Sequence, residues 1–172
     1  MTKWIYTDGA PFICADPATR KQWRGIQGSS TGRDESDYER ACNEPAYLGW
    51  IACSPSQVLV LGDEPAQAAF LVTPSGPAIA RWIACESMRL ADSVLAKIPS
   101  DLPHLQPAVR FTVSHPELWM FDASADGTVD TSISAAVNIE PGVFNVTTER
   151  LQNGRSFDFL IHRFVLTSLS AD

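Results

Sequence analysis

The stretch from Val58 to Cys85 constrains the fold of this chain more than any other. It contains three apolar runs, Val58–Leu61, Ala66–Val72 and Ala78–Ala84, separated by the turn-rich breaks GDEP and TPSGP. The runs are too short for independent helices, and their Val, Ile, Phe and Trp residues favour strands. The spacing predicts a β-meander, to which SPSQ joins a fourth strand at Ala46–Cys53.

Turn signals elsewhere in the chain separate pairs of apolar segments and predict further hairpins. They are Asp8-Gly9, His115-Pro116-Glu117, Glu140-Pro141-Gly142 and Asn153-Gly154. The last predicted strand, Phe157–Leu166, changes the parity of its apolar residues near His162 and Arg163. This change predicts either a β-bulge there or a strand that is covered on both faces.

One segment has the period of a helix. From Met88 to Ile98, within residues 86–98, apolar residues recur every three or four positions, and Pro99 ends the pattern. A short helix is also predicted at Asp34–Ala41, capped by Ser36 or Asp37. The preceding residues, 25–37, are rich in Gly, Ser, Thr and charge, and predict a mobile surface loop.

The length of the chain fits one domain. A chain of 172 residues buries roughly 70% of its unfolded surface, enough to fold without a metal or a disulfide. No linker or internal repeat divides it. We therefore expect a single domain, residues 1–172, of the mainly β (β-rich α+β) class: antiparallel meanders packed as two sandwich-like layers, with one amphipathic helix around residues 86–98.

The charge of the chain restricts its partners. The formal net charge is -7, which repels nucleic acid and anionic membranes and attracts a basic protein. No apolar run approaches the roughly 20 residues that span a bilayer, and the start of the chain, MTKWIYTDGAPF, does not have the pattern of a secretory signal. These features predict a cytoplasmic protein with no membrane and no direct nucleic-acid partner.

The cysteines are predicted to be free thiols in the core. Cys14, Cys42, Cys53 and Cys85 are far apart, form no CxxC pair, and each lies in or beside an apolar segment. Two disulfides are the alternative, which the cytoplasmic prediction disfavours.

No segment carries a strong catalytic, metal-binding or nucleotide-binding signature. The acids and hydroxyl from Asp122 to Asp130 resemble the start of a calcium loop, but its twelfth position is Ile133 instead of Glu, which favours an acidic turn. His104, His115 and His162 are not grouped with each other or with cysteine. We expect no catalytic residue, no metal and no cofactor.

Acidic side chains are the candidate partner-binding residues. Five acids stand against one arginine between Asp34 and Glu44, and two more lie in the GDEP turn. They form either solvated loop and helix faces or part of an acidic contact surface. The candidates are Asp34, Glu35, Asp37, Glu39, Glu44, Asp63 and Glu64. In the strand that follows the turn, alternation places Trp82 in the core and Arg81 outward or onto an acid.

Seven short segments, spread in order over most of the chain, form a recognisable pattern. They are Trp4-Ile5, Gly9–Ile13, Trp23-Arg24-Gly25, Asp37–Cys42, Tyr47-Leu48-Gly49, Leu59–Pro65 and Ile79–Trp82. This pattern resembles the immunity protein 21 family of bacterial polymorphic toxin systems. The resemblance implies a cytoplasmic inhibitor that binds the cognate toxin domain, occludes its active site and catalyses nothing.

Two other functions remain open from the sequence. One is a non-catalytic small-molecule or carbohydrate-binding β-sandwich module, which could depend on calcium at Asp122–Asp130. The other is an enzyme whose site is assembled from distant residues.

Overall fold

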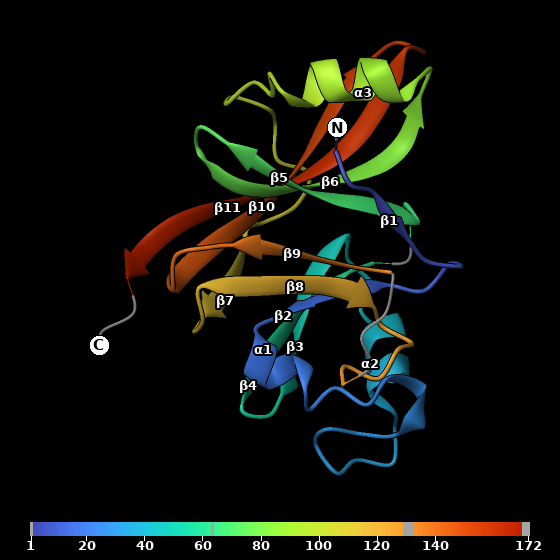
Figure 1. Cartoon of the computed structure of the whole chain (residues 1–172), viewed down its shortest axis with the longest axis vertical. Helices are drawn as coiled ribbons and strands as arrows, with labels where there is room; N and C mark the ends of the chain where they lie inside the picture. Colours follow the sequence, from blue (N-terminus) through green and yellow to red (C-terminus); the bar gives the residue numbers. More distant parts are fainter. Residues whose placement is uncertain (1, 63, 129–132, 170–172) are drawn as a thin grey trace.

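The computed structural model of the chain consists of two antiparallel β-sheets packed together, with helices at both ends of the molecule (Figure 1). The structure describes residues 2–62, 64–128 and 133–169. Strands far outweigh helices in these residues, so the mainly β, two-layer prediction is confirmed.

Sheet A contains six strands in the described part of the chain. In spatial order they are β1 (Ile5–Tyr6), β5 (Gln67–Thr73), β6 (Gly76–Cys85), β11 (Phe157–Leu169), β10 (Gly142–Asn153) and β7 (Val109–Val113). β10 and β11 pair along their whole length, from Gly142 opposite Leu169 to Asn153 opposite Phe157. The hairpin predicted at Asn153-Gly154 is therefore confirmed, and Gly154 has the positive φ of 54° that such a turn requires.

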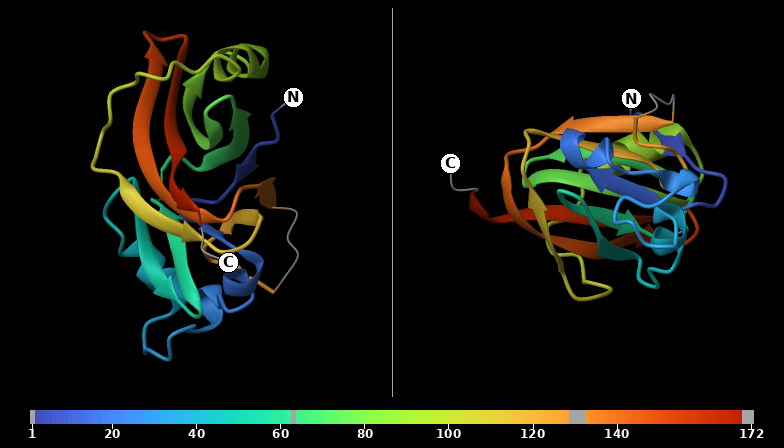
Figure 2. Two further views of the ribbon diagram at one scale, coloured as in Figure 1. Left: turned by 90° about the vertical axis from the view of Figure 1, so that its left-hand side faces the viewer. Right: turned by 90° about the horizontal axis from the view of Figure 1, so that it is seen from below.

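Sheet B contains five strands in the same described ranges. In spatial order they are β3 (Leu48–Cys53), β4 (Ser56–Leu61), β2 (Phe12–Ala15), β8 (Glu117–Asp122) and β9 (Ser134–Asn138). The two sheets lie one above the other in Figure 1 and are seen from two further sides in Figure 2.

The predicted amphipathic helix is present as α3 (Met88–Leu95), shorter than residues 86–98. The Ser87 side chain caps it by accepting a hydrogen bond from the amide of Leu90 at 3.2 Å. Ala91 and Leu95 are buried against sheet A. Two shorter helices, α1 (Pro17–Arg20) and α2 (Asp37–Cys42), and the single turn η1 (Gly25–Gln27) lie at the opposite end of the molecule (Figure 1).

Four of the predicted hairpin turns instead carry the chain from one sheet to the other. They lie between β1 and β2, β4 and β5, β7 and β8, and β9 and β10. The continuous meander predicted from Ala46 to Cys85 is therefore wrong, although its end hairpins, β3–β4 and β5–β6, are present. The hairpins predicted at Asp8-Gly9, His115–Glu117 and Glu140–Gly142 are wrong for the same reason. A short polar break permits either a hairpin or a crossing between layers, and long-range packing decides between them.

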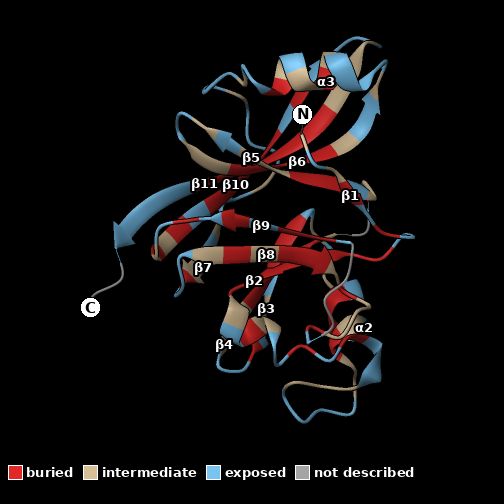
Figure 3. Ribbon diagram, in the orientation of Figure 1, coloured by how far each residue is buried: buried red, intermediate tan, exposed pale blue. Residues whose placement is uncertain are grey.

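Each sheet is covered on both faces. Between the sheets, Phe12, Leu59 and Phe164 are buried in the main core. Trp23 belongs to a second buried cluster with residues of β2 and β4, and Leu95 to a third with residues of β6 and β11. Buried residues, drawn in red, occur in the strands of both sheets (Figure 3). This double coverage explains why several strands are continuous apolar runs and do not alternate.

The last strand resolves the parity change that the sequence contains. Every residue of β11 from Phe159 to Phe164 is buried, so this part of the strand is covered on both faces. The register shifts lie at Val143/Phe144 and Asp158/Phe159, away from His162 and Arg163. Of the two predicted alternatives, the covered strand is confirmed.

The four cysteines are free thiols, as predicted. Cys14 and Cys53 are buried, and desolvation raises the pKa of both thiols. Cys85 is half-buried and Cys42, the last residue of α2, is exposed, so the prediction of burial is wrong for Cys42. None of the described helices is long and apolar enough to cross a membrane.

Candidate partner-binding site

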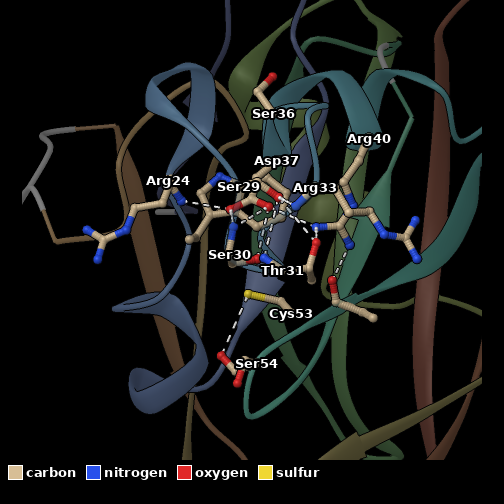
Figure 4. A network of polar contacts seen from close by, with 12 residues as sticks. Arg24, Ser29, Ser30, Thr31, Arg33, Ser36, Asp37, Arg40, Cys53 and Ser54 are labelled. Carbon is tan, nitrogen blue, oxygen red and sulfur yellow. Dashed lines mark hydrogen bonds and ion pairs between the residues drawn. The ribbon is translucent and has the colours of Figure 1, made fainter.

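Asp37 is the centre of a buried polar network, although the sequence made it a candidate for partner contact (Figure 4). Its carboxylate accepts hydrogen bonds from the amides of Arg24 at 2.9 Å and Ser30 at 3.0 Å. It also forms an ion pair with Arg40 at 2.8 Å, and Arg40 donates onward to the carbonyl of Ala52. Asp37 is fully buried. Its charge is paired inside the protein, and its hydrogen bonds hold the loop 25–37 against α2.

The other candidates on this loop and helix lie at the surface. Glu39 accepts from the backbone and side chain of Ser36, both at 2.8 Å, and these bonds lower the pKa of Glu39. They complete the capping box of α2, which confirms Ser36 as the cap. Glu35 accepts from the side-chain amide of Asn43, and Asp34 is exposed. Asp34, Glu35 and Glu39 line one hollow, here named the α2 hollow, together with Tyr38, Cys42 and Asn43.

Glu44 and Glu64 lie on a second concave surface, which the sequence does not predict. Two adjoining hollows share Tyr47, Glu64 and Leu105 and so form one groove, here named the central groove. Its remaining residues are Cys42, Glu44, Pro45, Ala46, Gly62 and Gln106 on one side, and Pro65, Ala66, Trp82, Ile83, Arg150 and Leu160 on the other. Because Cys42 also lines the α2 hollow, the two surfaces are continuous.

The connection between β4 and β5, residues 62–66, crosses from sheet B to sheet A and carries Glu64. Arg81 binds the backbone of this crossover. The guanidinium donates to the carbonyl of Gly62 at 2.7 Å and to that of Pro65, from Nε, at 2.8 Å. The amide of Gly62 in turn donates to the carbonyl of Tyr47 at 3.2 Å. A Cβ at Gly62 would lie 2.8 Å from the carbonyl oxygen of Ala46, so this close approach requires glycine.

These contacts correct the prediction for Arg81 and Trp82. Arg81 is fully buried, so its outward placement is wrong; its guanidinium lies 5.5 Å above the ring of Phe12 and donates to carbonyl groups. Trp82 is half-buried and packs edge-on against Trp4 and Phe159 at 5.2 and 5.4 Å. The carbonyls of Gly62 and Pro65 accept hydrogen bonds from inside the protein and need donors there, which explains an arginine inside an apolar strand.

Sheet A forms one side of the central groove. Arg81 is paired with Leu160 on β11, and Leu160 with Arg150 on β10, so these residues form a row across three strands. Arg150 binds the carboxylate of Asp158 through Nε at 2.9 Å and Nη2 at 2.5 Å. This bond raises the pKa of Arg150. The carboxylate of Asp158 thus balances the positive charge of the one arginine that lines the groove in the described part of the chain.

Leu105 projects from the connection between α3 and β7. Its amide donates to the carbonyl of Thr148 at 2.7 Å. The next side chain, Gln106, donates to the carbonyl of Leu48 at 2.7 Å and so ties this connection to sheet B as well. Leu105 remains 43% exposed and Tyr47 51% exposed, so the groove presents apolar surface to solvent.

A family model for immunity protein 21 matches residues 3–156 of the chain. The chain belongs to the immunity protein 21 family. Comparisons with curated proteins and with solved structures found no match. The family supports a general role as an immunity protein, a class that binds a toxin protein and is generally not enzymatic.

Segments of the immunity protein 21 pattern meet at the two places described above. Trp23 donates from its indole to the carbonyl of Ala123 at 2.9 Å, and Asp37 binds the next residue, Arg24. These residues stabilise the end of the molecule that contains α2. The residues of the pattern that line the central groove are Cys42, Tyr47, Gly62, Glu64, Pro65 and Trp82.

Two buried polar groups with ionisable side chains, Glu149 and His162, lie outside the groove. Glu149 accepts from Arg163 at 2.8 Å and from Thr147 at 2.8 Å, and all three residues are buried. His162 is fully buried, with Nδ1 3.1 Å from the hydroxyl of Thr148, and burial lowers its pKa to about 3. Both groups are enclosed by protein, and their contacts are those of structural polar pairs.

The acidic stretch considered for calcium forms local turns in the described residues. Asp122 accepts from the amide of Ser124 at 2.7 Å. Asp126 accepts from the amide of Thr128 at 2.8 Å and lies 3.7 Å from Arg24. Asp130 lies outside the described residues, as does Asp63 of the GDEP turn. No group of three potential metal ligands occurs within the described ranges.

Proposed function

We propose that this protein is a cytoplasmic immunity protein that binds a cognate toxin of a bacterial polymorphic toxin system and occludes its active site. The observation that carries the proposal is the family match over residues 3–156. Inhibition by binding needs no reacting group of the inhibitor, only a surface that is complementary to the toxin.

The charge of the protein supports a basic partner. With a formal net charge of -7, it attracts a positively charged protein surface and accelerates the encounter. Toxins that cleave nucleic acid need a basic cleft for their substrate, and an acidic inhibitor can occupy that cleft. A stable complex of this kind buries about 1,600 Å² in total.

The contact surface that we propose consists of the α2 hollow and the central groove. It contains five of the seven acidic candidates, Asp34, Glu35, Glu39, Glu44 and Glu64. Asp63, which precedes Glu64 in the chain, remains a candidate on its sequence position. Asp37 is left out because its carboxylate is buried and bonded.

Co-expression with the product of the neighbouring toxin gene tests this function. We expect that the toxin alone stops growth, that growth is restored with this protein, and that the two co-purify as a complex. Absence of both rescue and complex would refute the proposal.

A further inference from the structure

The central groove combines apolar walls with negative charge. Tyr47 and Leu105 are about half exposed on it, and Glu44 and Glu64 lie beside them. Arg150 is already bound by Asp158, so the carboxylates of Glu44 and Glu64 set the sign of the charge among the described lining residues.

The two glutamates of the groove differ in how they are used. Glu44 is half-buried and accepts from the amide of Ala46 at 3.3 Å. Glu64 is exposed and has no hydrogen-bond or ion-pair partner among residues 2–62, 64–128 and 133–169. A partner can therefore bind the carboxylate of Glu64 without breaking a bond inside the protein.

The groove is also preformed. The bonds from Arg81 to Gly62 and Pro65 fix both ends of the crossover that carries Glu64. The bond from the amide of Leu105 to Thr148 fixes the opposite wall. A backbone that is held in place before binding loses little entropy on binding, which favours affinity.

We infer that the central groove receives one lysine or arginine side chain of the toxin; the inference rests on the function proposed above. The aliphatic stem packs between Tyr47 and Leu105, and the charged head pairs with Glu64. Only lysine and arginine combine a long apolar stem with a positive head. An acidic segment would be repelled, and a wholly apolar segment would desolvate Glu64 without compensation.

Binding of a catalytically inactive form of the neighbouring toxin domain, measured by titration calorimetry, tests this inference. We expect Glu64→Gln to weaken binding about tenfold and Glu64→Lys about a hundredfold or more, because a like charge then faces the bound head. Tyr47→Ala is expected to weaken binding about tenfold by removing the wall that holds the stem.

Glu140 supplies the matched control. It is exposed and belongs to a separate hollow with His115 and Asn138. Glu140→Lys makes the same change in net charge as Glu64→Lys and should alter affinity by less than about threefold, through long-range attraction only. Thermal melting of each variant shows that the fold is retained.

A charge exchange identifies the bound residue. Each surface lysine and arginine of the toxin domain is changed to glutamate and tested against Glu64→Lys. We expect one such toxin variant to bind Glu64→Lys at least tenfold better than it binds the wild-type protein.

The outcomes separate the two proposals. If the wild-type protein neither binds nor neutralises the toxin, the proposed function fails, and this inference fails with it. If the wild-type protein binds but Glu64→Lys and Tyr47→Ala bind equally well, the function stands and the groove is the wrong surface. Equal losses of toxin affinity in Glu64→Lys and Glu140→Lys would show that only the net charge of the protein matters, and would also overturn the inference.

Discussion

The network around Asp37 and the crossover that carries Glu64 use arginine in opposite ways. Arg40 binds the carboxylate of Asp37, so the acid is neutralised and the loop is held in the interior. Arg81 binds the backbone carbonyls of Gly62 and Pro65, so the crossover is fixed while the carboxylate of Glu64 remains at the surface. The comparison shows that the binding partner of a nearby arginine decides whether an acidic residue stabilises the fold or is available to another protein.

The largest effect that this comparison predicts is on Asp37. Asp37→Ala leaves the buried Arg40 without its ion-pair partner and two amides without their acceptor, and should cost about 3–5 kcal/mol of unfolding free energy. Urea denaturation measures this loss. Asp34→Ala, three positions earlier at the surface, is the control and should change stability by less than about 0.5 kcal/mol. Similar losses for both would contradict the distinction.

Removing the second arginine should have a smaller effect. Arg81→Met retains much of the apolar volume but leaves the carbonyls of Gly62 and Pro65 without their donor, at a cost of about 2–3 kcal/mol. It should also weaken toxin binding, since the crossover is no longer fixed, whereas Asp37→Asn, if folded, should leave the groove unchanged. Urea denaturation and calorimetry test the two parts. Unchanged toxin affinity in folded Arg81→Met would show that toxin binding does not need the hydrogen bonds from Arg81 to the crossover.

The pH dependence of stability tests the interior around Arg81. Burial, and secondarily the charge of Arg81, lowers the pKa of His162 to about 3. An unfolded chain binds a proton at His162 below about pH 6.5 while the folded protein does not, so the stability due to neutral His162 is present above pH 6.5 and falls with decreasing pH. Between pH 6.5 and 4.5 this single group should cost roughly 2–3 kcal/mol. His162→Gln should remove that part of the slope in urea denaturation, and His115→Gln, at an exposed turn, should not.

The smallest expected effect is that of Glu64→Gln on stability. Because Glu64 has no partner within the described residues, the change should alter the unfolding free energy by less than about 0.5 kcal/mol. A loss above 1 kcal/mol in the same denaturation assay would show that Glu64 supports the crossover, and would remove the contrast with Asp37.

The fold class could be predicted from sequence because the apolar runs are short, rich in β-formers and separated by turn residues. The layer that each strand enters could not. Leu61 at the end of β4 pairs with Phe12, whereas Ala68 in β5 pairs with Ile5. These partners lie far away in the chain, so local spacing cannot show that the break between β4 and β5 is a crossing between sheets.

The candidate site was only partly predictable for a related reason. Acidic residues were visible in the sequence, but the direction of each carboxylate depends on its neighbours in three dimensions. Tyr47 and Leu105 were missed because neither side chain is acidic, and they line one groove only in the folded chain. Two patterns in the sequence do indicate the roles of the buried arginines. Arg81 is isolated in the apolar run AIARWIA, and Arg40 follows Asp37 by one helical turn.

The stoichiometry of inhibition tests most directly whether the protein acts by covering its partner without reacting. Purified toxin at a fixed concentration, well above the dissociation constant, is titrated with this protein and its residual activity is measured at once and after an hour. We predict a linear fall to zero at one equivalent, unchanged with time. Progressive loss of activity at a small fraction of one equivalent would indicate catalysis, and no loss at any ratio would refute a role in immunity.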